Sequence, residues 1–131
     1  MKKLTTLIFA MALSLAAMAE QPHKVYCEVW GTSTTNIIGY LYIDYGQEDR
    51  YRNWLVDDNG KGIYFDTMIQ VLNYMAKRGW ELEAAYDTQT SKTMFDETKI
   101  ESKHSLILSK MVTSDDEITE GFCTRSMYKN H

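Results

Sequence analysis

The sequence predicts an α+β fold, in which one amphipathic helix packs on one face of an antiparallel sheet of four to five strands. Three observations lead to this prediction. Short runs of β-branched and aromatic residues alternate with polar segments, as in strands joined by turns. Residues 67–78 carry apolar side chains at helical spacing. Asn59-Gly60 is a strong signal for a tight turn. The predicted order is strand, strand, hairpin, helix, strand, strand.

Residues 1–19 have the three parts of a secretory signal peptide. Lys2 and Lys3 form a positive start, residues 4–17 are mostly apolar, and Ala17 and Ala19 are the small residues of a cleavage site. The apolar stretch is short for a membrane anchor, although a single anchoring helix is the alternative. We therefore predict an exported chain, periplasmic or secreted.

The predicted organisation is a signal peptide over residues 1–19, a single α+β domain over residues 20–110 and a polar C-terminal tail over residues 111–131. The whole chain has a net charge of −4, and loss of the signal peptide removes two lysines and no acids, which moves it to −6. An acidic domain lacks the basic surface of a nucleic-acid-binding protein. It also lacks a polybasic patch that would hold it on anionic lipid.

Two strands are predicted first, over residues 24–30 and 37–45, and a charged loop follows over residues 46–53. Residues 54–56 and 63–65 are then expected to pair as a hairpin around a type I′ turn at Asn59-Gly60. The neighbouring aspartates lack the alternating ligands of a calcium loop, so the turn is favoured.

The predicted helix spans residues 67–78, and Asp66 is expected to cap its N-terminus. Gly79 takes the left-handed stop position, and Trp80 is expected to pack back on Met75. The side chains expected to face the sheet are Met68, Ile69, Val71, Leu72, Met75 and Ala76.

After the helix, residues 80–87 are predicted to form a strand whose core face carries Leu82, Ala84 and Tyr86. A long polar loop is expected over residues 88–103. The last strand is predicted over residues 104–110, and residues 111–131 are expected to be mostly irregular unless Cys123 anchors them. The apolar residues of the long loop are expected to rest on the body of the domain: Met94, Phe95 and Ile100.

The region around the helix resembles a family of small secreted bacterial domains of unknown function. These domains share a helix that ends in Gly-Trp and is followed by two strands. The matching stretches are Tyr45-Gly46-Gln47, Asp58-Asn59-Gly60-Lys61, Phe65-Asp66-Thr67-Met68, Leu72-Asn73-Tyr74-Met75, Gly79-Trp80-Glu81 and Leu106-Ile107-Leu108-Ser109-Lys110. The resemblance covers about residues 24–110 and implies one helix on an antiparallel sheet. It implies no reaction, because the family has none assigned.

The chain has two cysteines, Cys27 and Cys123. Export permits a disulfide between them. In the chain-entropy model, closing a loop of about 100 residues would contribute about 4–5 kcal/mol to stability. Two unrelated thiols, one in a strand and one in the tail, are an equally good interpretation, because the sequence does not supply the geometry of a bridge.

Candidate catalytic residues are few. His104 is the one histidine in a predicted element, since His23 and His131 lie near the chain ends. A small hydrolase-type enzyme that uses His104 with a nearby carboxylate is therefore one hypothesis. A lone histidine at the start of a strand is also an ordinary, partly buried strand residue. No zinc-ligand spacing and no glycine-rich phosphate loop is present, so no metal or cofactor is predicted.

Aromatic residues crowd into the stretch 40–64. Exposed tyrosine and tryptophan offer a large rigid contact area with a polar group, which suits binding. Aromatic residues are also good strand formers, which is the structural alternative. The candidate partner-binding residues are Tyr40, Tyr42, Tyr51 and Trp54. They favour a non-enzymatic protein- or ligand-interaction module of the cell envelope, whose partner is an envelope protein or an extracellular ligand. A purely structural partner or an inhibitor is a further alternative.

Overall fold

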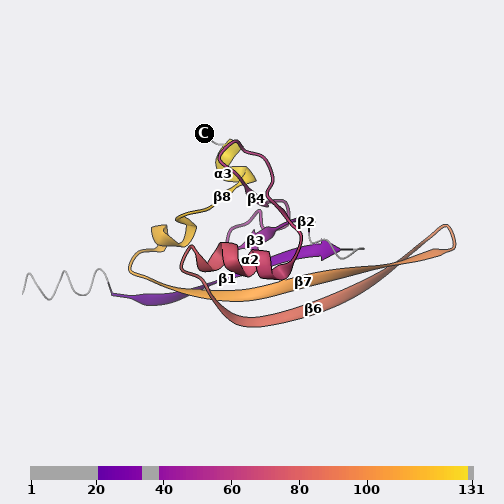
Figure 1. Cartoon of the computed structure of the whole chain (residues 1–131), viewed down its shortest axis with the longest axis horizontal. Coiled ribbons are helices and arrows are strands. Elements are labelled where there is room, and N and C mark those ends of the chain that lie inside the picture. Colours follow the sequence, from indigo (N-terminus) through magenta and orange to yellow (C-terminus); the bar gives the residue numbers. More distant parts are fainter. Residues whose placement is uncertain (1–20, 34–38, 130–131) are drawn as a thin grey trace, which may run out of the picture.

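The computed structural model describes residues 21–33 and 39–129 and has an α+β fold dominated by an antiparallel sheet (Figure 1). The main sheet has the strand order β3-β1-β7-β6. Its strands are β1 (His23–Ser33), β3 (Tyr42–Asp44), β6 (Glu81–Met94) and β7 (Glu97–Val112). The predicted fold class is confirmed. The predicted signal peptide and part of the predicted second strand lie outside the described residues.

Two short strand pairs complete the fold. β2 (Gly39–Tyr40) pairs with β5 (Tyr64–Phe65), and β4 (Leu55–Val56) pairs with β8 (Cys123–Thr124), both antiparallel. The strand of residues 37–45 was predicted as continuous, whereas the structure divides its described part into β2 and β3. This division lets neighbouring residues serve two different sheets.

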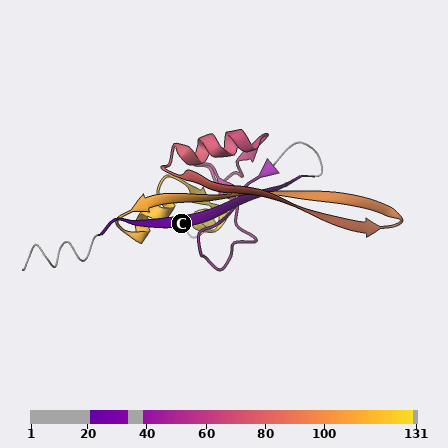
Figure 2. The same cartoon turned by 90° about the horizontal axis from the view of Figure 1, so that it is seen from below.

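The helix α2 (Met68–Ala76) lies along one face of the main sheet (Figure 2). Its N-cap is Thr67, whose hydroxyl accepts a hydrogen bond from the Gln70 amide at 3.2 Å, so the prediction of Asp66 was wrong. Gln70 in turn accepts a hydrogen bond from the Asp66 amide at 2.8 Å. The two side chains thus satisfy two amides at the helix start, which is the principle of a capping box.

The face of α2 that meets the core is narrower than predicted. Val71 and Met75, one turn apart, are fully buried, whereas Ile69 and Ala76 are exposed. Steps of about 100° per residue place Ile69 about 160° and Ala76 about 140° from Val71 around the helix, so both lie away from the buried side. Beyond α2, the Trp80 amide donates to the Met75 carbonyl at 3.2 Å, and both side chains belong to the core. The predicted return of Trp80 onto Met75 is confirmed.

The chain reverses at residues 57–60, but not through a type I′ turn. Only Gly60 has a positive φ there, at +79°, whereas a type I′ turn needs two such residues. The Asp57 carboxylate explains the difference, because it accepts hydrogen bonds from the amides of Asn59 and Lys61, both at 2.9 Å. The predicted hairpin survives as a single bridge between Val56 and Gly62, while β4 and β5 take their main partners elsewhere.

The long loop predicted over residues 88–103 is instead the continuation of two strands. β6 and β7 pair from Glu81–Ser109 to Met94–Glu97, and the turn between them is Phe95-Asp96, both with positive φ. The many threonines of this segment favour strands. The hairpin extends away from the rest of the molecule (Figures 1 and 2). Phe95 is 93% exposed and Ile100 is also exposed, so the expectation that they rest on the body was wrong.

β6 is an edge strand, and its side chains do not follow the predicted alternation. Leu82, Ala84 and Tyr86, predicted to face the core, are all exposed. Every residue from 81 to 90 is exposed, so neither face of this part of β6 is buried. A bulge between Leu82 and Ala84 also shifts the register of β6 against β7.

The core lies between the sheet and α2. Its fully buried members come from β1, β3, β4, α2, β7 and the residue between β2 and β3, and they include Val29, Leu41, Ile43, Leu55, Val71, Met75 and Leu108. The segment predicted as a mostly irregular tail forms the 3-10 helix η1 (Asp115–Thr119), β8 and the helix α3 (Arg125–Lys129). This segment contributes buried Phe122 and Thr124, so it is part of the packed domain.

Candidate functional site

Six aromatic side chains form a continuous series, which we call the aromatic row. Each ring centroid lies between 5.7 and 6.2 Å from that of the next ring. In order, the row consists of Tyr64, Tyr40, Trp54, Tyr42, Trp30 and Tyr51. These distances are typical of favourable aromatic pairs. All four candidate binding residues of the sequence analysis thus lie in one cluster.

Strand pairing positions most of these rings. Trp30 of β1 is the Cα partner of Tyr42 of β3, and their rings stack at 5.7 Å with an interplanar angle of 12°. Tyr42 forms an isolated bridge with Trp54, and Tyr40 is the Cα partner of Tyr64. Side chains that are directly opposite across two strands interact. The row is therefore assembled by register.

One ring of the row is buried, and the rings at both ends are exposed. Trp30 is only 6% exposed, whereas Tyr40 is 46%, Tyr64 is 62% and Tyr51 is 69% exposed. Gly62 makes room for the Tyr40 ring, because a Cβ at this position would lie 2.7 Å from Tyr40 Cε1. The exposed rings are thus held in place by contacts that do not need a partner.

Three cations lie over rings of the row. The Arg125 guanidinium is 4.6 Å from the centroid of Trp54, Lys103 Nζ is 4.8 Å from Trp30, and the Arg50 guanidinium is 4.8 Å from Tyr51. Such cation–π contacts contribute about 0.5–1 kcal/mol at exposed sites. The Arg125 amide also donates to the Trp54 carbonyl at 2.9 Å, which fixes the two residues side by side.

Sequence reasoning found four members of the row and missed two as binding candidates, Trp30 and Tyr64. Tyr64 belongs to the aromatic-rich stretch, but Trp30 lies in the first strand and joins the row only through long-range pairing. Tyr45 belongs to the same stretch yet packs against Phe122 at 6.1 Å, away from the row. Burial raises the pKa of Tyr45, which fits a structural role.

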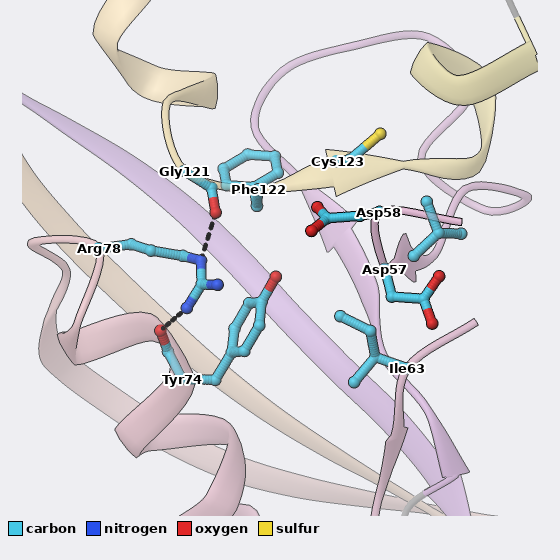
Figure 3. A pocket seen from close by; sticks show the side chains of 9 residues that line it. Asp57, Asp58, Ile63, Tyr74, Arg78, Gly121, Phe122 and Cys123 are labelled. Carbon is cyan, nitrogen blue, oxygen red and sulfur yellow. Dashed lines mark hydrogen bonds between the residues drawn. The ribbon is translucent and has the colours of Figure 1, made fainter. Parts of the chain in front are cut away.

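A separate cavity of about 480 Å³ lies between α2, the turn after β4 and the segment that leads into β8 (Figure 3). Apolar walls come from Val56, Ile63 and Phe122. Polar groups of Asp57, Asp58, Tyr74 and Arg78 complete the lining, with Gly121 and Cys123 at the side of β8.

Tyr74 and Arg78 form one unit at this cavity. The Arg78 guanidinium lies 3.5 Å from the centroid of the Tyr74 ring and donates to the Tyr74 carbonyl at 2.7 Å. Burial raises the pKa of the Tyr74 hydroxyl, Arg78 opposes this increase, and the charges of Cys123 and Asp58 add to it. The hydroxyl is therefore protonated at neutral pH and available as a donor or an acceptor.

His104 lies on the main sheet, and its Nδ1 is 2.9 Å from a carboxylate oxygen of Asp87. The two residues are direct partners across β6 and β7. The hypothesis of an enzyme needs a histidine in hydrogen-bond reach of an acid inside a pocket. The first condition is met. The cavity described above does not include His104, and neither does a second cavity of about 290 Å³ beside Tyr26 and Cys27.

Both cysteines are free thiols in the structure, Cys27 in the core and Cys123 half-buried in β8. Burial raises the pKa of Cys27 to about 12. The candidate bridge between them is not formed, which corresponds to the interpretation of two unrelated thiols.

Among the residues that the structure describes, no group of three or more histidines, cysteines and acids is placed to hold a metal ion. Within the same residues, none of the helices has the length and apolar character needed to cross a bilayer. Comparisons with protein-family models, curated proteins and solved structures gave no match to this chain. The resemblance to a family of small secreted domains stays a prediction.

Proposed function

We propose that the chain is an exported, non-enzymatic interaction domain of the cell envelope that binds an envelope protein or an extracellular ligand through the aromatic row. The single observation that carries this proposal is the continuity of six rings with three cations over them. Tryptophan, tyrosine and arginine are the residues that most often dominate binding energy at protein interfaces. Export is supported by the signal-peptide pattern of residues 1–19.

The packing of the row makes it suited to binding. An aromatic pair contributes about 0.5–1.5 kcal/mol beyond its buried area. Because the rings already pack against one another, little side-chain entropy remains to be lost when a partner arrives. Immobilising a mobile side chain at an interface costs about 0.5–1.5 kcal/mol. Trp30 is buried and packs against Tyr42 and Tyr51, while Tyr51 and Tyr64 are largely exposed.

The test is capture of a partner from the native envelope by crosslinking, with variants that separate binding from folding. Tyr51→Ala and Tyr64→Ala remove exposed rings at the two ends of the row, so we expect weaker capture with a folded domain that loses no more than about 1.5 kcal/mol of unfolding free energy. Tyr26→Ala is the matched control, since Tyr26 is an exposed tyrosine of β1 outside the row. Equal capture by the row variants and the wild type, or an equal loss in the control, would refute the proposal.

A hydrolase-type enzyme is the second candidate, favoured by the hydrogen bond between His104 and Asp87. The Asp87 side chain is 65% exposed, so this pair also fits an ordinary surface contact between strands. Hydrolytic activity that His104→Asn abolishes without loss of folding would support the enzyme. Activity that survives the substitution would exclude His104 as its catalytic residue.

A further inference from the structure

The cavity beside α2 has the size and the mixed lining of a small-molecule site. Its volume of about 480 Å³ falls in the range of about 300–1,000 Å³ that is usual for ligand pockets. Such pockets combine apolar walls with a few converging polar groups. Here the walls are Val56, Ile63 and Phe122, and Figure 3 shows Arg78 on one side of the cavity and Asp57 and Asp58 on the other. The cavity is separate from the aromatic row.

Arg78 supplies the positive side, and it is held rigidly. Its Nε donates to the Gly121 carbonyl at 2.5 Å and its Nη1 to the Tyr74 carbonyl at 2.7 Å. Figure 3 shows Nη2 directed into the cavity without a hydrogen bond to the residues drawn. A guanidinium has five N–H groups, so two bonds to the backbone orient it while others stay available for an anion.

The negative side comes from the turn after β4. Asp57 uses one carboxylate oxygen to hold the turn, through hydrogen bonds to the amides of Asn59 and Lys61. Asp58 is exposed and its carboxylate points toward the cavity, as does the Tyr74 hydroxyl (Figure 3). Asp58 and Arg78 form no ion pair within 4 Å in the described part of the chain, and both line the cavity of about 480 Å³.

We propose that this cavity binds a free α-amino acid with an apolar side chain, held as a zwitterion between Arg78 and Asp58. The ligand carboxylate accepts from Arg78, the ammonium group donates to Asp58, and the side chain lies against Ile63 and Phe122. A ligand with only one charge would be attracted by one of the two charged side chains, Arg78 or Asp58, and repelled by the other. A ligand with both charges satisfies both, and charge-assisted hydrogen bonds are the stronger kind.

The test is an NMR titration of the purified exported protein with L-leucine and two blocked analogues. N-acetyl-L-leucine lacks the ammonium group, and L-leucinamide lacks the carboxylate. We expect saturable shifts of the Asp58, Arg78 and Gly121 amides with L-leucine. We expect each analogue to bind about tenfold or more weakly, because each loses one charge-assisted contact.

Asp58→Asn provides the variant, because among the described residues the carboxylate that holds the turn after β4 is that of Asp57 and not that of Asp58. It should weaken L-leucine binding about tenfold, while Asp66→Asn, an exposed carboxylate outside the cavity, should leave it unchanged. No saturable shift in the millimolar range, or an analogue that binds as tightly as L-leucine, would overturn the proposal. Tyr51→Ala should not alter L-leucine binding, so this result is independent of the aromatic row.

Discussion

Gly62→Ala is the most incisive test of how the aromatic row is built. The new Cβ would lie 2.7 Å from Cε1 of Tyr40, whereas carbon atoms in contact prefer about 3.5–4.0 Å. The Tyr40 ring must therefore move by about 1 Å. No positive φ marks Gly62, so the backbone accepts alanine and the effect is confined to the ring.

The magnitude follows from two opposing terms. Moving the ring disturbs its stack on Trp54, now at 5.8 Å and 11°, which costs about 0.5–1.5 kcal/mol. Alanine in place of glycine restricts the unfolded chain and contributes about 0.4–1 kcal/mol in the other direction. We therefore expect a net loss below about 1 kcal/mol, with a clear shift of the Trp54 indole N–H signal and weaker partner capture.

A double-mutant cycle decides whether the ring is the cause. In a Tyr40→Ala background the clash disappears, so Gly62→Ala should become neutral or stabilising by about 0.4–1 kcal/mol. Chemical denaturation measures all four free energies of unfolding. An equal cost of Gly62→Ala in both backgrounds would refute the reasoning, because the substitution would then act without Tyr40.

Burial and charge lead to four further expectations. Trp30→Ala should lower the free energy of unfolding by about 3–5 kcal/mol in a denaturant titration. A loss below about 1 kcal/mol would contradict the burial of this ring in the row. In the reduced native protein Cys123 should react with a thiol reagent, while Cys27, with its pKa raised to about 12 by burial, should react only on unfolding; intact mass spectrometry counts the labels. Because the folded pKa of Cys27 exceeds its unfolded value, its stabilising contribution is complete below pH 9 and is lost as the pH rises toward 12. The pKa of His23 is raised by its hydrogen bond to Asp115, so its NMR titration midpoint should fall in Asp115→Asn, and an unchanged midpoint would exclude that contact.

Local signals in the sequence predicted the helix well, because its start, its stop at Gly79 and the return of Trp80 all depend on neighbours in the chain. The cap was misplaced by one residue, since Thr67 and Asp66 are both good caps and the choice depends on the reach of Gln70. The outward position of Ile69 follows from helix geometry, because a step of about 100° per residue places it about 160° from Val71 around the axis, so the predicted apolar arc was too wide.

Long-range pairing explains what the sequence did not predict. β4 pairs with β8, a strand near the C-terminus. The pairing of Leu55 with Thr124 could therefore not be predicted from the residues on either side of Leu55. The same reason kept Trp30 out of the candidate site, although the tyrosines around Trp54 stood out. Neither face of β6 is buried over residues 81–90, because β6 lies at the edge of the sheet, and no residue type marks an edge strand or the bulge between Leu82 and Ala84.

The central pairing of the main sheet has a consequence for how the protein is made. β1 pairs along its whole length with β7, from His23–Val112 to Ser33–Ser102. The first strand of the domain therefore cannot form this pairing until β7, near the end of the chain, is present. Contacts between such distant segments form slowly. While the chain is being synthesised, it therefore cannot complete the main sheet. It stays unfolded enough to pass through a narrow channel until its final third, which contains β7, has been made.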